Sequence, residues 1–219
     1  MNETRKRFLL RLCSLIFGLF LFALGIVFTL KANIGYAPWE VLHVGLSKLT
    51  GLSIGLMSIS VGLLIILIVW LLGEKIGLGT VFNMILIGLF LDFLLFLNII
   101  PLVEGLISGI IMLIIGIIII AFGSYFYIKS AFGAGPRDSL MVVLARITKL
   151  PIGICRGSVE LLALLGGWLL GGLVGVGTVI FVVAMGFFVQ LVFKIFKFDA
   201  TKVKHETLNE TVKALFGKS

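Results

Sequence analysis

The sequence GYAPWE at residues 35–40 has a counterpart, GAGPRD, at residues 133–138. Setting Pro38 against Pro136 gives an offset of 98 residues, the difference between 136 and 38, and at this offset the two halves align without a gap. The register also pairs Trp70-Leu71-Leu72-Gly73 with Trp168-Leu169-Leu170-Gly171, and Gly77-x-Gly79-Thr80-Val81 with Gly175-x-Gly177-Thr178-Val179. Chance matches in Leu-rich sequence would not keep Trp, Pro, Thr and Gly in one register, so we interpret the chain as an internal duplication.

The composition excludes a soluble globular domain. Hydrophobic residues make up 60% of the chain and charged residues 13%, against roughly 45–50% and about 25% in soluble domains, so there is too little polar surface to cover a globule. A helix needs about 20 apolar residues to cross a bilayer. Six runs approach or exceed this length: Phe8–Leu30, Ile54–Leu72, Thr80–Leu97, Leu106–Ile128, Ile152–Leu170 and Val176–Phe193.

The topology follows from three runs in each repeat. Because three is odd, the second copy must enter the membrane from the opposite side. The positive-inside rule supports this, since with an internal N-terminus the outer segments carry only Lys31 and Lys48. The inner segments and ends carry Arg5, Lys6, Arg7, Arg11, Lys75, Lys129, Arg137, Arg146, Lys149, Lys194, Lys197, Lys202, Lys204, Lys213 and Lys218. This charge is explained by membrane orientation, and we expect no nucleic-acid partner.

These patterns predict an all-α membrane protein with six transmembrane helices, arranged as two inverted three-helix repeats. The first repeat covers residues 1–100, the second 101–197, and residues 198–219 form a cytoplasmic amphipathic tail. The many glycines, Gly88, Gly116 and Gly186 among them, are expected to allow close helix packing.

Each repeat also contains the motif Gly-x-x-Pro-x-acid. Proline suits the first turn of a helix, glycine permits unusual backbone angles just before it, and an acid there favours the helix N-terminus. The motif predicts a chain break followed by a short broken or re-entrant helix near 38–49 and 136–149, too short to span. Such breaks often bind substrate or ions in inverted-repeat transporters. The alternative is that Glu40 and Asp138 simply cap these helices.

Ionisable residues inside apolar runs are costly and are functional candidates. Arg156 and Glu160 are spaced to pair at i and i+4, and we weigh a structural salt bridge against a role in substrate or proton binding. Asp92 is interpreted either as a solvated acid near the outer interface or as a proton site. His43, one turn after Glu40, fits an interfacial polar residue better than a ligand.

Residues of the two motifs and of the charged pair are therefore the candidate substrate-binding set. This set is Gly35, Tyr36, Pro38, Trp39, Glu40, Gly133, Gly135, Pro136, Arg137, Asp138, Arg156 and Glu160. The candidates for proton coupling are Glu160, Glu40, Asp138 and Asp92. Cys13 and Cys155 are the only cysteines and no CxxC occurs, so we expect free thiols, no metal and no cofactor. No P-loop, HExxH or nucleophilic triad pattern is visible, which disfavours an enzyme.

The paired motifs, each followed by an amphipathic stretch and an Ile-Gly start to the next run (Ile54-Gly55 and Ile152-Gly153), resemble the YczE/YyaS/YitT group of bacterial integral membrane proteins. The resemblance covers nearly all of residues 8–195 and is closest to the YczE-like branch. It implies a multi-pass protein of the bacterial plasma membrane, which together with the charge distribution places both termini in the cytoplasm. It implies little about the substrate.

Three functions are compatible with these features. The first is a secondary transporter or permease for a small solute, with Arg137 and Arg156 attracting an anion and an acid carrying a coupling proton. The second is a membrane-embedded regulatory or assembly partner without transport activity, which predicts a closed and dry interface between the halves. The third is a lipid-handling protein with a laterally open groove. Inverted repeats suit alternating access, so transport is preferred.

Overall fold

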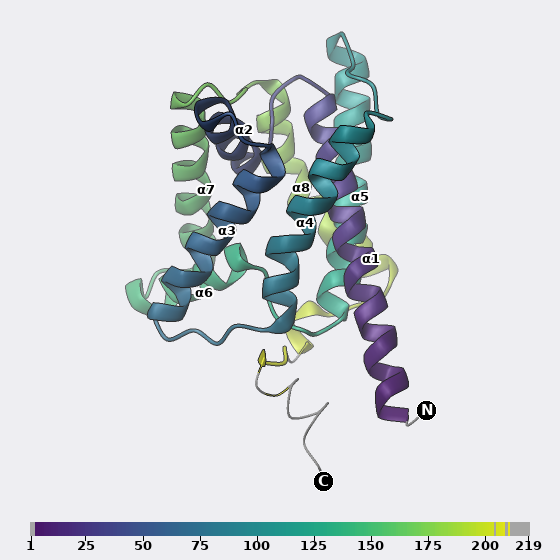
Figure 1. Ribbon diagram of the computed structural model, residues 1–219, viewed down its shortest axis with the longest axis vertical. Coiled ribbons are helices and arrows are strands. Elements are labelled where there is room, and N and C mark those ends of the chain that lie inside the picture. The colour runs from purple at the N-terminus through teal and green to yellow at the C-terminus, as the bar shows by residue number, and fades with distance from the viewer. Residues whose placement is uncertain (1–2, 204, 209, 211–219) are drawn as a thin grey trace.

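A computed structural model describes residues 3–203, 205–208 and 210. Within these residues the protein is all-helical (Figure 1). The helices are α1 (Glu3–Lys31), α2 (Pro38–Thr50), α3 (Ile54–Leu71), α4 (Leu78–Leu97), α5 (Leu106–Lys129), α6 (Pro136–Thr148), α7 (Ile152–Leu169) and α8 (Val176–Ile195), followed by the 3₁₀ turn η1 (Ala200–Lys202).

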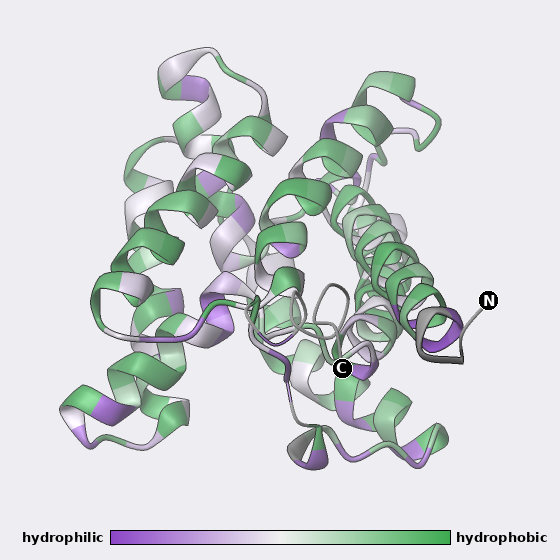
Figure 2. Ribbon diagram, turned by 60° about the horizontal axis from the view of Figure 1, so that its bottom comes forward, coloured by the Kyte–Doolittle hydropathy of each residue, from purple (hydrophilic) through white to green (hydrophobic). Residues whose placement is uncertain are grey.

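Six of these helices are long and apolar enough to cross a membrane. They are α1, α3, α4, α5, α7 and α8, and they correspond to the six apolar runs of the sequence. Apolar residues predominate along them, whereas hydrophilic residues gather toward helix ends and connecting loops (Figure 2). The prediction of an all-α protein with six spans is therefore confirmed, and α2 and α6 are the two short helices that the motifs indicated.

The most extensively packed helix pair is that of α1 and α5. Glycine makes this approach possible, because a Cβ on Gly18 would lie 2.6 Å from the Tyr127 backbone nitrogen and one on Gly25 would lie 2.6 Å from the Gly116 carbonyl oxygen. Small residues let two transmembrane backbones approach in this way. Around this pair, α4 packs on α1 and α8 packs on α5.

The last three helices of each half occupy equivalent sequence positions. Adding 98 to the bounds of α2, α3 and α4 gives the bounds of α6, α7 and α8. The short helix α2 lies at one end of the bundle and α6 at the other, whereas α1 begins at the end where α8 finishes (Figure 1). The equivalent bounds agree with a duplication, and the inverted orientation of the halves stays a prediction.

The two halves differ at one helix seam. In the first half α3 packs along α4, where a Cβ on Gly88 would lie 2.6 Å from the Gly55 carbonyl oxygen. In the second half α7 and α8 make no comparable contact. At their equivalent glycines, Gly153 and Gly186, an added Cβ would have no heavy atom of the described residues within 4 Å, apart from the glycine's own helix backbone and chain neighbours. The prediction of close packing therefore holds for Gly88 and is wrong for Gly186, which faces open space.

Part of the C-terminal tail returns to the bundle. The Glu206 backbone N–H donates to the Ala131 carbonyl oxygen at 2.9 Å, and the Glu206 carboxylate pairs with Arg11 at 2.6 Å. The Leu208 N–H donates to the Ile76 carbonyl oxygen at 3.0 Å. Of the predicted tail at 198–219, positions 204, 209 and 211–219 lie outside the described residues.

Candidate functional site

The two short helices form as the motifs predict. Pro38 and Pro136 occupy the first helical position, where a missing backbone N–H costs nothing. Three residues earlier, Gly35 and Gly133 adopt positive φ angles of 119° and 128°, which other residues rarely tolerate. The observed bounds, Pro38–Thr50 and Pro136–Thr148, differ by one residue from the predicted ends.

Each chain break is anchored by the last helix of the opposite half. The Gly177 N–H at the start of α8 donates to the Ile34 carbonyl oxygen, and the Gly79 N–H at the start of α4 donates to the Phe132 carbonyl oxygen, both at 2.7 Å. Thr80 adds a hydroxyl bond of 2.6 Å to the Ala134 carbonyl oxygen. The repeated Gly-x-Gly-Thr motif therefore holds each short helix by contacts that cross between the halves.

The N-terminal ends of α2 and α6 face a cavity of about 520 Å³. Its walls include residues of α1, α3, α4, α5, α7 and α8 as well as the two short helices. The predicted site residues that line it are Pro38, Trp39, Glu40, Gly135, Pro136, Arg137, Asp138, Arg156 and Glu160. The structure thus brings together residues that are about 100 positions apart in the sequence.

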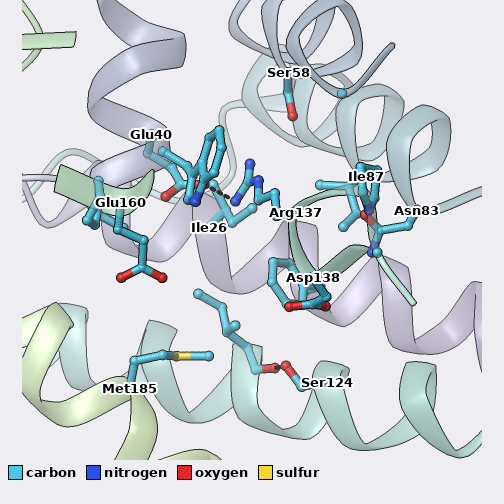
Figure 3. A pocket seen from close by; sticks show the side chains of 18 of the residues that line it. Ile26, Glu40, Ser58, Asn83, Ile87, Ser124, Arg137, Asp138, Glu160 and Met185 are labelled. Atoms are coloured by element: carbon cyan, nitrogen blue, oxygen red, sulfur yellow. Dashed lines mark hydrogen bonds and ion pairs between the residues drawn. The ribbon is translucent and has the colours of Figure 1, made fainter. Parts of the chain in front are cut away.

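Glu40, Arg137 and Trp39 form a contact between the halves. The Arg137 guanidinium lies 3.8 Å from a Glu40 carboxylate oxygen and 4.6 Å from the centre of the Trp39 ring. A cation over an indole face is electrostatically favourable. In Figure 3 Glu40 and Arg137 lie on one side of the cavity, and Met185 of α8 and Ser124 of α5 lie on the other. The contact joins α2 to α6 through charge at the cavity wall.

Glu40 and His43 belong to α2, which is not one of the six spans, and both side chains are buried. Burial raises the pKa of the Glu40 carboxyl, an effect that the Arg137 charge partly offsets. Burial, with a smaller contribution from Arg137, lowers the pKa of His43 well below its ordinary range. His43 is therefore neutral, and Glu40 is the acid on α2 whose protonation is made easier by its surroundings.

The second ion pair lies on α7. The Arg156 Nε donates to a Glu160 carboxylate oxygen at 2.9 Å, which confirms the predicted i,i+4 pair. Both residues line the cavity, and the side chains are 57% and 22% exposed, so this pair is open to whatever fills the cavity. The equivalent positions of α3 are Ser58 and Gly62, which makes the charge a property of one half alone.

Two buried polar atoms on the cavity wall have no hydrogen-bond partner among the residues that the structure describes. They are His43 Nε2, on a side chain that is 1% exposed, and the Tyr127 hydroxyl, on a residue that is 4% exposed. A buried polar group without a partner costs about 1–3 kcal/mol, so such groups call for a ligand or water. The sequence favoured an interfacial role for His43 and did not single out Tyr127. The equivalent residue of Tyr127 is Thr29, and only this loss of symmetry could have drawn attention to it.

Four candidate residues lie away from the cavity lining. Gly35 and Gly133 shape the breaks, and the Tyr36 N–H donates to the Leu173 carbonyl oxygen at 3.1 Å. Asp92 accepts hydrogen bonds from the Ser53 hydroxyl at 2.5 Å and from the Gly55 N–H at 2.8 Å. Its carboxylate thus holds the N-terminus of α3 at the closed α3/α4 seam.

The cavity carries the chemistry of an ion-binding site. Its described lining contains two guanidinium groups, three carboxylates and the two unpartnered polar atoms on otherwise mainly apolar walls. Within the part of the chain that the structure describes, no group of three His, Cys, Asp or Glu residues could hold a metal ion. Cys13 and Cys155 are both free thiols. The arrangement suits an organic ion with an apolar body.

Comparison with known proteins gives relatives along most of the chain. The model of the family described as "Family of unknown function (DUF6198)" matches residues 9–194. An uncharacterized protein of Haemophilus influenzae is 37% identical over 80% of this chain and 80% of its own length. Two Bacillus subtilis proteins are also similar: the uncharacterized membrane protein YczE is 34% identical over 77% of this chain and 79% of its own, and the uncharacterized protein YyaS is 30% identical over 74% and 82%. The predicted resemblance is thereby confirmed. No solved structure matches.

Proposed function

We propose that this chain, which belongs to the DUF6198 family of unknown function, is a secondary transporter or permease for a small solute, with an anionic solute favoured, and that it works without enzymatic chemistry. The proposed location is the bacterial plasma membrane, with both termini in the cytoplasm. Fusion of a reporter that is active only outside the cell to the C-terminus should give no activity, whereas a cytoplasmic fluorescent reporter should give signal.

The observation that carries the proposal is the difference between two equivalent helix seams beside one cavity. The α3/α4 seam is closed by packing of Gly55 against Gly88, and the α7/α8 seam is not. Residues of both α7 and α8 line the cavity, so the unpacked seam borders it. Alternating access needs two such seams that close in turn around a fixed site.

If the two halves are inverted, the other conformation of the transport cycle can be described from the present one. Exchanging the conformations of the two halves would close the α7/α8 seam by packing Gly153 against Gly186 and would open the α3/α4 seam. We propose that the present state is open toward the cytoplasm, which with the termini inside is the end of the bundle where both α1 and α7 begin (Figure 1). The cavity then reaches the other face only after the exchange.

Thiol accessibility tests this without knowledge of the solute. In a protein with Cys13 and Cys155 replaced by serine, Ser58→Cys places a thiol on the cavity wall. Ser60→Cys is the matched control, since Ser60 lies on the same helix, is exposed and does not line the cavity. A charged, membrane-impermeant methanethiosulfonate should label Ser58→Cys from either face of sealed vesicles and should not label Ser60→Cys.

The alternatives predict different labelling. A regulatory partner with a closed interface leaves Ser58→Cys unlabelled by any reagent. A lipid-handling protein gives labelling by a lipid-soluble maleimide and none by the charged reagent. Labelling of Ser58→Cys from only one face, whatever the membrane potential or pH gradient, would contradict alternating access.

A further inference from the structure

Arg137 is placed to bind a ligand anion. Its guanidinium carries five N–H donors, yet among the described residues its contacts are the Trp39 ring and the Glu40 carboxylate at 3.8 Å, which is beyond hydrogen-bond distance. Its side chain is 29% exposed and lines the cavity. The planar fork of arginine matches a carboxylate through two parallel hydrogen bonds. The donors are therefore available without moving the chain.

The rest of the cavity suits an organic acid better than an inorganic anion. A volume of about 520 Å³ exceeds what chloride or phosphate needs, and Ile26, Ile87 and Met185 are among the side chains that give it apolar walls. The unpartnered atoms of His43 and Tyr127 supply further hydrogen bonding on these walls. Besides Arg156, which is paired with Glu160, the site therefore offers Arg137 as a cationic anchor, a few polar contacts and room for an apolar body.

Glu40 controls whether Arg137 is free. While Glu40 is ionised it competes with an incoming carboxylate for the same guanidinium, and when it is protonated the competition ends. The charged and titratable groups that face Glu40 come from three helices: α2 itself, α6 and α7. The helix α3 also packs on α2 but contributes none, since it has no titratable side chain. They are His43, Arg137, Asp138, Arg156 and Glu160.

Two of these groups are held by each other and one is neutral. Arg156 and Glu160 form their own pair on α7, and burial keeps His43 uncharged. Asp138 follows Arg137 in the first turn of α6, where burial raises the pKa of its carboxyl and the charges of Arg156 and Arg137 partly offset this effect. Among the described residues, the ion pair of Arg137 is with Glu40 and not with Asp138. The exchange of partners at Arg137 therefore depends on Glu40.

We infer that the site binds a small monocarboxylate together with one proton, the carboxylate on Arg137 and the proton on Glu40, so that the protein is a proton–carboxylate symporter. This rests on the proposed transport function and names its substrate class and coupling. The proton adds one positive charge and the carboxylate one negative charge, so the charge of the cavity is the same when it is empty and when it is loaded. Transport is therefore electroneutral, driven by a pH gradient and indifferent to membrane potential.

The fluorescence of Trp39 can be used to measure binding directly. Trp70 and Trp168 are exposed and do not line the cavity, so Trp70→Phe with Trp168→Phe leaves Trp39 as the single indole. A carboxylate that draws the Arg137 guanidinium off the ring should change its fluorescence. The purified full chain is titrated with acetate and with butyrate at a series of pH values. Chloride, phosphate and glycine are titrated in parallel for comparison. A soluble pH dye measures the protons taken up on binding.

The expected result is saturable binding of acetate and butyrate, with affinity rising about tenfold for each unit by which the pH falls and one proton taken up per anion. In Glu40→Gln, carboxylate affinity should be high and independent of pH. Arg137→Lys should lose at least about tenfold in affinity, because the bidentate fork is gone. Arg146→Lys, on the same helix but outside the cavity, should bind like the parent protein. Elution volume and helical circular dichroism establish that each variant is folded.

Several outcomes would overturn the inference. These are equal or tighter binding of chloride, phosphate or glycine, a carboxylate affinity that does not depend on pH, an unchanged pH slope in Glu40→Gln, or no fluorescence response to either carboxylate. If Ser58→Cys is still labelled from both faces in these cases, the transport proposal stands and only the substrate class and coupling are wrong. If Ser58→Cys is labelled from neither face while carboxylates bind, the transport proposal fails instead.

Discussion

Substituting Gly88 and Gly186 by alanine, one at a time, compares the two seams at equivalent positions. Both glycines lie in the middle of a transmembrane helix, so the gain in helix propensity, up to about 1 kcal/mol, is the same for both and cancels in the comparison. A Cβ on Gly88 would lie 2.5 Å from Ile59 Cγ1 and 2.6 Å from the Gly55 carbonyl oxygen, whereas one on Gly186 meets nothing within 4 Å apart from its own helix backbone and chain neighbours. What remains is the cost of overpacking at Gly88 alone, about 1–3 kcal/mol.

Thermal unfolding in detergent is the assay for this difference. For a chain of 219 residues, each kcal/mol corresponds to a shift of about 2–4 °C, so the melting temperature of Gly88→Ala should fall below that of Gly186→Ala by about 2–12 °C. Gly186→Ala should melt at or above the temperature of the parent protein. Equal losses of stability would show that α7 and α8 pack as closely as α3 and α4, and the reasoning about two unequal seams would be refuted.

Other substitutions test the charged groups and the open seam. Glu160→Gln should sharply reduce transport with expression unchanged, with Glu104→Gln, in an exposed loop, as control; retained uptake would remove Glu160 from the mechanism. Asp92→Asn weakens the hydrogen bonds from Ser53 and Gly55 to the carboxylate at the start of α3 and should lower the free energy of unfolding by about 1 kcal/mol. Carboxylate binding, measured by Trp39 fluorescence in the protein with Trp70→Phe and Trp168→Phe, should not change; altered binding would contradict a purely structural role of Asp92. Gly157→Ile, which gives α7 the side chain found at the equivalent position of α3, should raise the melting temperature and slow carboxylate binding; faster binding would be inconsistent with an access route between α7 and α8.

The helices and the short-helix motifs could be predicted because they depend on local sequence. Proline at the first helical position and glycine three residues earlier predicted where α2 and α6 begin, and the predicted C-terminal ends are within one residue of those observed. The pair of Arg156 and Glu160 was also predictable, since residues four apart on a helix are neighbours whatever surrounds them. The duplication stays a prediction from the register of the two halves, and the equivalent helix bounds agree with it.

The long-range contacts were not predictable from one sequence. Nothing local indicates that Arg137 reaches Glu40 across the halves, or that the Gly79 N–H bonds the Phe132 carbonyl oxygen. Asp92 was considered as a proton site, but the fold turns it toward the N-terminus of α3. The same offset aligns Gly88 with Gly186, yet only one is packed, because the residues across each seam differ.

The difference between the seams has a cause in the sequence that also bears on coupling. Ile59 fills the space against Gly88, and its equivalent is Gly157, which has no side chain to pack against Gly186. One residue before it, Arg156 begins the ion pair that borders the cavity. Closing the α7/α8 seam would remove this pair from water, and burying an ion pair carries a desolvation cost that its own attraction need not repay. In the proposed cycle this cost falls on the α7/α8 seam alone, because the equivalent positions of α3, Ser58 and Gly62, carry no charge.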